Sequence, residues 1–162
     1  MSEIEQQPNL IFNKISGFLT EKNINFNSLH HKPTFTSEES AKERGEDISI
    51  GGKAILMKLD DTFKLFVLSA SKKLDNKKIK VKFNAKKIRF ASVDELKELT
   101  GLVPGSVPPF GSPILPFDLF VDNSINLNEK IAFNAGSLTD SIVMLVKDYL
   151  VAASPTVFDF SS

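Results

Sequence analysis

Apolar residues near the start of the chain recur at helical spacing. The pattern predicts an amphipathic helix over residues 9–22, from the helical spacing of Leu10, Ile11, Ile15, Phe18 and Leu19. The segment 25–31 that follows is typical of a short strand.

Two later segments are apolar on both faces. Residues 53–58 and 63–69 lie on either side of Asp60, Asp61 and Thr62, a polar group that is typical of a turn. This pattern predicts a hairpin, and its two strands are expected in the centre of a sheet because neither face is polar.

Helix starts are marked at two places by a Ser/Thr-x-x-Glu sequence. Thr36 with Glu39, and Ser92 with Glu95, can each form a capping box. Glycines at 45 and 101 are placed to end the two helices.

Residues 75–84 fit two patterns. Lys78 to Phe83 alternate between polar and apolar as a strand would, whereas Ile79 and Phe83 also share a helical face. Periodicity alone favours the strand.

The remaining pattern predicts further strands and a closing helix. The strands are expected at 87–91, 118–122, 131–134 and 141–146, and the helix at 147–152. Together these elements indicate a single α+β domain over residues 1–162, with a largely antiparallel or mixed central β-sheet flanked by short helices. Residues 1–24 hold the first helix and residues 25–152 the core.

Composition excludes several classes of protein. At 162 residues with 41% apolar side chains, one core can form without crosslinks. The absence of cysteine excludes disulfides, a thiolate nucleophile and a cysteine-ligated metal, and His30 and His31 alone do not make a histidine metal site. We expect no metal and no cofactor. The polar start and the lack of a long apolar segment predict a cytoplasmic protein with no membrane partner.

Charge is balanced overall but not along the chain. Between residues 72 and 89 there are nine basic residues and one acid, although the formal net charge is zero. Such a local basic surface can contact the phosphates of a nucleic acid, or it can be only a solvated face.

Lys53 is the first candidate for chemistry. Alternation places it on the strand face of Ile55 and Met57, so its side chain should be half-buried. It either reaches solvent at the strand edge or presents a focused positive charge to an anion. Gly51 and Gly52 before it allow close approach of a partner.

The segment 100–111 is rich in glycine and proline. Its prolines stiffen the backbone and its glycines permit positive φ, which is typical of a preorganised binding loop or of a rigid connection. Its N–H groups could stabilise an oxyanion. The N–H donors expected are those of Gly105, Ser106, Val107, Phe110 and Gly111.

A third segment, residues 133–137, combines small residues at the end of a predicted strand. It favours either close backbone approach or a turn capped by Asp140. A Ser-His-Asp triad is compatible with the spacing, but the chain contains no Gly-x-Ser-x-Gly elbow.

Taken in order, the segments around residues 31–36, 51–53, 66–75, 100–111 and 133–137 resemble the YbaK-like editing family, which includes the editing domain of bacterial prolyl-tRNA synthetases. Members hydrolyse the ester that joins a wrong amino acid to tRNA. The resemblance implies a short helix within 75–84 and a free-standing trans-editing deacylase, because the chain carries no synthetase domain. Its expected partner is the aminoacylated acceptor end of tRNA, with a synthetase as a further candidate and no DNA.

The resemblance also assigns residues to roles. For catalysis it implies Lys53, Gly105, Ser106, Gly111, Asn134 and Gly136. For substrate binding it implies His31, Thr36, Val107, Pro108, Pro109, Phe110, Ala135 and Ser137. The basic segment adds Lys72, Lys73, Lys77, Lys78 and Lys82 as contacts to tRNA. An ester needs little activation, so backbone donors with a positioned water or the ribose hydroxyl would suffice.

One position departs from the family pattern. Members specific for alanyl-tRNA often carry histidine where this chain has Asn134. Alanine, serine, threonine and cysteine all stay open as the edited amino acid, because a pocket discriminates weakly between small side chains. The alternative function is a non-catalytic domain of the same fold that binds tRNA or a synthetase, and a small-ligand domain is a third.

Overall fold

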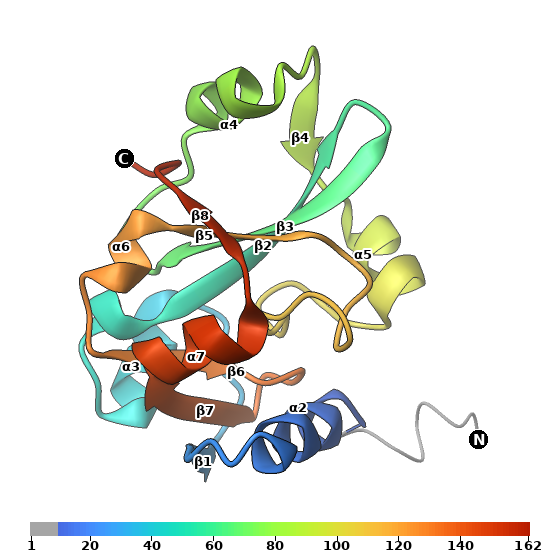
Figure 1. Cartoon of the computed structure of the whole chain (residues 1–162). Helices are drawn as coiled ribbons and strands as arrows, with labels where there is room; N and C mark the ends of the chain where they lie inside the picture. Colours follow the sequence, from blue (N-terminus) through green and yellow to red (C-terminus); the bar gives the residue numbers. More distant parts are fainter. Residues whose placement is uncertain (1–9) are drawn as a thin grey trace.

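The computed structural model describes residues 10–162. Its strands form two sheets, one of three strands and one of five, with helices around them (Figure 1). The α+β class is therefore confirmed, while the strands expected in one central sheet divide between two.

The three-stranded sheet is antiparallel throughout and has the order β1-β7-β6. Its strands are β1 (Asn27–His30), β6 (Lys130–Asn134) and β7 (Asp140–Leu145). A parallel bridge between Gly51 and Ala132 joins this sheet to the start of β2 (Gly52–Leu59) in the larger one. A side chain at Gly52 would overlap Ile131, at 2.6 Å, so this close approach requires glycine.

The five-stranded sheet is mixed and has the order β4-β2-β3-β5-β8. Besides β2, its strands are β3 (Thr62–Ser69), β4 (Ile88–Phe90), β5 (Leu119–Asp122) and β8 (Thr156–Phe158). The predicted hairpin is confirmed, and β2 and β3 are central strands. The pairs β3–β5 and β5–β8 are parallel, and β8 was not predicted.

Helices surround the sheets, and two of these helices begin at the caps expected at Thr36 and Ser92 (Figure 1). They are α2 (Leu10–Glu21), α3 (Ser37–Arg44), α4 (Asn76–Phe83), α5 (Val93–Thr100), α6 (Asn123–Asn126) and α7 (Val146–Ala153), with a 3₁₀ turn η1 (Ile48–Ile50). The short α6 and η1 were not predicted, and residue 9 of the first predicted helix lies outside the described residues.

The ambiguous segment 75–84 is helical. Asp75 caps α4 by accepting from the N–H groups of Lys77 and Lys78, and Asn84 ends the helix in the left-handed conformation. Ile79 is fully buried in a phenylalanine-rich cluster. The alternating pattern pointed to a strand because the lysines of this helix surround a narrow apolar stripe, and the caps decide the local structure.

Two groups of buried side chains hold the domain together. The larger lies between α2, the two sheets and α7, and includes Ile15, Leu19 and Tyr149. The smaller lies on the other face of β2 and β3 under α4. No helix among residues 10–162 is long and apolar enough to cross a membrane.

Candidate active site

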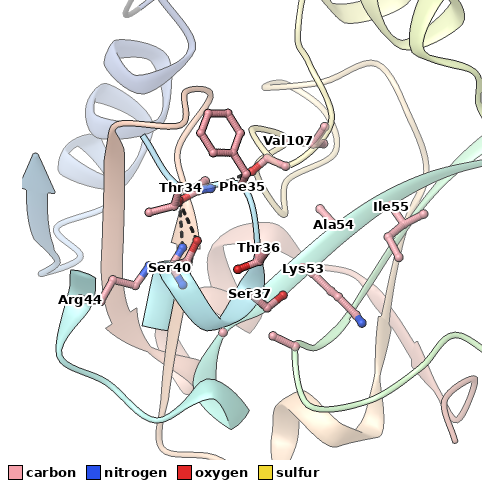
Figure 2. Close-up of a pocket in the computed structure, with 15 residues that line it drawn as sticks. Thr34, Phe35, Thr36, Ser37, Ser40, Arg44, Lys53, Ala54, Ile55 and Val107 are labelled. Atoms are coloured by element: carbon pink, nitrogen blue, oxygen red, sulfur yellow. Dashed lines mark hydrogen bonds between the residues drawn. The ribbon is translucent and has the colours of Figure 1, made fainter. Parts of the chain in front are cut away.

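A cavity of about 200 Å³ opens where the two sheets approach each other (Figure 2). Its walls come from the turn before α3 and from α3 itself, the start of β2, Ala70 after β3, the loop after α5, and Asn134 at the end of β6. Segments that are far apart in the sequence therefore meet at one place.

Helix α3 turns its small polar side chains to this cavity. Thr36 is the N-cap and accepts from the N–H of Glu39, as predicted, although the Glu39 carboxylate accepts from Phe35 N–H instead of closing the box on Thr36. Ser40 and Arg44 follow at four-residue spacing and lie on the same face. The hydroxyls of Ser40 and Thr34 are 2.8 Å apart.

Arg44 is the functional candidate that the sequence analysis missed. Its Nη2 donates to Asn134 Oδ1 at 3.0 Å and its Nε donates to Ser141 Oγ at 2.9 Å. Burial lowers the pKa of Arg44 to about 10, which keeps it charged at neutral pH. Its four-residue spacing from Ser40, on a helix already marked by a cap, was the signal that could have found it.

The charge of Arg44 is held by neutral groups. Within residues 10–162 it forms no ion pair, and its Nη1 has no hydrogen-bond partner. A Cβ added at Gly51 would lie 3.6 Å from Nη1, which places this nitrogen beside the cavity wall. Arg44 can thus donate to an acceptor that enters the cavity.

Asn134 connects Arg44 to the glycine-proline loop. Its Nδ2 donates to the Gly105 carbonyl at 2.7 Å, while its Oδ1 also accepts from Ser141 Oγ at 3.1 Å. Gly105 is therefore fixed by a chain of hydrogen bonds that begins at Arg44.

His31 lies behind this network and does not line the cavity. Its Nε2 is 2.8 Å from Ser141 Oγ and its Nδ1 is 2.8 Å from the Lys32 carbonyl. The structure brings His31 next to the site as a support for Ser141.

Lys53 lines the cavity from β2 and is half-buried, as predicted. Figure 2 shows its side chain extending away from Thr34 and Phe35. Burial lowers the pKa of Lys53, the Glu38 carboxylate opposes this shift, and the charge of Lys73 adds to it. Lys53 is thus a partly desolvated cation at the edge of the cavity.

The loop contributes Gly105 and Val107 to the cavity wall. In the described part of the chain neither N–H has a hydrogen-bond partner, so both can serve as donors. Ser106 differs from these two residues, because its N–H donates to the Val103 carbonyl at 3.1 Å and its own carbonyl accepts from the Gly136 N–H.

The end of the loop, residues 108–111, is buried in the core. Phe110 is 1% exposed and packs edge-on against Phe133 and Tyr149. The Tyr149 hydroxyl donates to the Pro109 carbonyl at 2.6 Å. A side chain at Gly111 would overlap the Phe117 carbonyl, at 2.5 Å. None of Pro108, Pro109, Phe110 and Gly111 lines the cavity, so the structure places them where they anchor the loop.

Of the segment 133–137, only Asn134 reaches the cavity. Ala135 is fully buried. Gly136 has φ +85° and donates from its N–H to Ser106, and a side chain there would overlap Ile11, at 2.6 Å. These residues hold the loop and the first helix against the end of β6.

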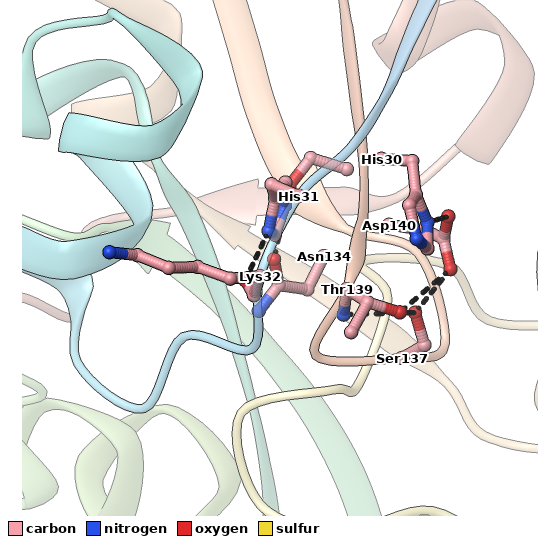
Figure 3. A network of polar contacts seen from close by, with 8 residues as sticks. His30, His31, Lys32, Asn134, Ser137, Thr139 and Asp140 are labelled. Atoms are coloured by element: carbon pink, nitrogen blue, oxygen red, sulfur yellow. Dashed lines mark hydrogen bonds and ion pairs between the residues drawn. The ribbon is translucent and has the colours of Figure 1, made fainter.

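Ser137, His30 and Asp140 do not form a catalytic triad. Figure 3 shows His30 and Ser137 both directed at Asp140, with His30 Nδ1 2.8 Å from Oδ1 and Ser137 Oγ 2.8 Å from Oδ2. The serine therefore has no contact with the imidazole that would activate it.

The basic residues differ in their availability. Lys72, Lys73 and Lys77 are exposed. Lys78 donates to Asp159 and to the Ser161 carbonyl, and the ammonium of Lys82 lies over the Phe158 ring. Only the first three have side chains without such contacts among the described residues.

No group of His, Asp and Glu suited to a metal ion occurs among residues 10–162. The chemistry that the cavity offers comes from two cations, backbone N–H groups and hydroxyls. This set can bind and polarise an ester, and it supplies no protein nucleophile with an adjacent base.

Known proteins share this fold. A crystal structure of a candidate trans-editing enzyme for prolyl tRNA synthetase superposes with a TM-score of 0.79 at 22% identity, and the match covers 93% of this chain and 96% of that one. This likeness concerns the fold.

Sequence relatives are named for tRNA editing or prolyl-tRNA synthesis. The "Multifunctional Ser/Thr-tRNA deacylase ProXp-y" of Escherichia coli K12 is 28% identical over 160 residues, 91% of this chain and 90% of the relative. A "Proline--tRNA ligase" of Shouchella clausii is 33% identical over 100 residues, 62% of this chain but 17% of the ligase. The model of the family described as "Aminoacyl-tRNA editing domain" matches residues 31–151, more than half of the chain, and these residues include the whole cavity wall. The chain thus belongs to the aminoacyl-tRNA editing domain family.

Proposed function

We propose that this chain is a trans-acting deacylase that hydrolyses the ester of mischarged aminoacyl-tRNA in the cytoplasm. The observation that carries the proposal is the cavity lined by Lys53, Arg44, Gly105 and Val107, in a chain of the editing family. The unit comprises residues 25–152 preceded by the first helix.

The proposed reaction needs electrostatic help more than a nucleophile. When water attacks the ester carbonyl, negative charge develops on its oxygen. The N–H groups of Gly105 and Val107, which have no partner among the described residues, stabilise this charge by donating hydrogen bonds to it. One such donor contributes about 3 kcal/mol to a transition state. The attacking water is held by the protein or activated by the ribose hydroxyl, and Lys53 attracts the phosphate beside the ester.

The preferred substrates are Ser-tRNA and Thr-tRNA. The cavity wall carries the hydroxyls of Thr34, Thr36, Ser37 and Ser40 and the Nη1 of Arg44, which can pair with a hydroxyl of the amino acid. A cavity of about 200 Å³ suits a small side chain. The E. coli relative named as a Ser/Thr-tRNA deacylase agrees with this choice.

The test compares Lys53→Ala with Lys58→Ala. Both lysines are half-buried on β2, but Lys58 lies over the Phe63 ring and outside the cavity. We expect kcat/KM on Ser-tRNA and Thr-tRNA to fall about tenfold or more for Lys53→Ala, since a charged contact is lost, and to change little for Lys58→Ala. Ala-tRNA and Cys-tRNA complete the panel.

The alternative is a non-catalytic domain that binds tRNA or a synthetase. If wild-type protein binds tRNA but cleaves none of the four esters faster than buffer does, the deacylase proposal fails and this alternative takes its place.

A further inference from the structure

A second cavity, of about 300 Å³, adjoins the first. The two share Ala54, Ile55, Gly105 and Val107 in their walls. Polar and apolar groups share the lining of the first cavity about equally, whereas apolar side chains from β2, β4, α5 and Pro104 dominate the second, with Ser92 as a hydroxyl at its edge. The two form neighbouring chambers along strand β2.

The shared wall includes an open edge of β2. Strand β4 pairs only with residues 57–59, and Ala91 N–H then donates to the Leu56 carbonyl at 2.9 Å. In an antiparallel pair, the backbone groups of alternate residues point to the same side, so the N–H and carbonyl of Ala54 point to the edge that Leu56 presents to Ala91.

These two groups of Ala54 lack a protein partner at that edge. Within residues 10–162 no hydrogen bond joins Ala54 to β4 or to the loop after α5. A backbone donor and acceptor that are partly buried without partners favour a ligand that satisfies both. The chamber thus combines one adjacent donor-acceptor pair with apolar walls.

An exposed aromatic ring stands at the mouth of the second cavity. Phe90 lines it and is 58% exposed. Exposed large apolar side chains that rim a cavity mark a binding surface. A flat aromatic face is suited to stacking with a nucleobase.

We propose that the second cavity binds the adenine of the 3′-terminal nucleotide of tRNA. This inference rests on the proposed function, in which the ester on the ribose of that nucleotide occupies the first cavity. Only the ribose separates base from ester, so the base must lie in an adjoining space. Adenine presents an acceptor, N1, beside a donor, the 6-amino group, which match the N–H and the carbonyl of Ala54. The purine ring stacks on Phe90.

The test uses AMP and IMP as probes, followed by NMR of the amide groups. Inosine carries N1–H and a 6-oxo group, which reverses the donor and the acceptor. AMP should shift the amide signals of Ala54 and Phe90 and bind about tenfold or more tightly than IMP, because a reversed pair leaves buried groups unsatisfied.

Variants at the rim complete the test. Phe90→Ala should weaken AMP binding, Phe90→Tyr should retain it, and Val93→Ala should leave it unchanged, since Val93 is exposed but does not line the cavity. Equal affinity for AMP and IMP, or AMP shifts confined to another part of the protein, would overturn the inference. Deacylation is measured separately: hydrolysis without AMP at Ala54 refutes only the adenine site, and AMP binding without hydrolysis refutes only the proposed function.

Discussion

Arg44, the last residue of α3, contacts β6 and β7 through the neutral side chains of Asn134 and Ser141. A cation that is partly buried without an acid depends on these bonds to offset lost hydration. Its guanidinium also positions Asn134, whose amide holds the Gly105 carbonyl at 2.7 Å. One side chain thus supports both the cavity wall and the donors of the loop.

Arg44→Gln should lower both stability and activity. It removes the bonds to Asn134 and Ser141, so we expect the free energy of unfolding in urea to fall by about 1–3 kcal/mol and kcat/KM for Ser-tRNA to fall about tenfold. Arg44→Lys keeps the charge but cannot bond to both Asn134 and Ser141 with the same geometry. Its unfolding free energy and its kcat/KM should therefore lie between those of the wild type and of Arg44→Gln.

Arg89→Gln is the matched control. Arg89 is exposed and pairs with Glu95 at 2.7 Å outside the cavity lining. Its loss should change neither measurement appreciably. Wild-type deacylation by Arg44→Gln would contradict the role given to Arg44.

At the scale of elements, the loop after α5 acts as a rigid unit. Pro109 and Phe110 fix it to the core, and Ser106 is bonded to both Val103 and Gly136. Pro108 and Pro109 therefore serve packing, and Gly105 and Val107 are the part of the loop that lines the cavity.

Gly105→Ala and Gly101→Ala separate backbone strain from function. Both glycines have positive φ, at +88° and +76°, and neither position would force an added methyl closer than 3.4 Å to a neighbour. Each change should cost about 1–2 kcal/mol of unfolding free energy. Only Gly105→Ala should also lower kcat/KM, because Gly101 ends α5 away from the cavity. Equal activity of the two variants would argue against a role of Gly105 in catalysis.

Strand β8 depends on a buried carboxylate. Asp122 accepts from the N–H groups of Phe160 and Ser124 and from the Ser161 hydroxyl. Burial raises the pKa of Asp122, but these hydrogen bonds together outweigh burial and hold the pKa below its ordinary value. The stability it contributes is therefore present above the ordinary aspartate pKa and is lost as the pH falls through the folded pKa.

Asp122→Asn tests this dependence. The free energy of urea unfolding should fall for the wild type between about pH 7 and about pH 3, and less steeply for the variant. At neutral pH the variant should be less stable by about 1–3 kcal/mol, because Asn cannot accept all three bonds. An identical pH slope in both proteins would rule out Asp122 as a contributor.

At the scale of the whole molecule, the formal net charge is zero, but basic residues are concentrated on a surface next to the cavity. Lys72 and Lys73 follow Ala70, which lines the cavity, and the charge of Lys73 reaches Lys53. A basic surface beside the cavity can contact the phosphates of a nucleic acid.

Lys72→Gln and Lys73→Gln should each weaken tRNA binding and reduce the slope of log K against log salt by about 1. Lys78→Gln is the control, since that side chain already pairs with Asp159 and the Ser161 carbonyl. Binding titrations at several salt concentrations give the slopes. Equal effects of all three changes would contradict this prediction. They would show that Lys78 contributes to tRNA binding as much as Lys72 and Lys73 do, despite its contacts with Asp159 and Ser161.

Local signals in the sequence were sufficient to predict most of the helices and strands. The caps at Thr36 and Ser92 start helices as predicted, and the hairpin of β2 and β3 has its turn at Asp60 and Asp61. Strand β8 was not predicted, because Thr156 to Phe158 are too few to show an alternating pattern. Pairing with β5 decides their strand structure.

The sequence by itself determined the helices that begin at Thr36 and Ser92, the hairpin, the rigidity of the glycine-proline loop and the resemblance to an editing family, because caps, periodicity and ordered motifs are local properties. Only the tertiary structure decided which groups face the cavity. Gly105 and Phe110 belong to one loop, yet one lines the site and the other lies in the core. Arg44 became a candidate because folding brings Asn134 and Ser141, far away in the sequence, within hydrogen-bond distance of its guanidinium.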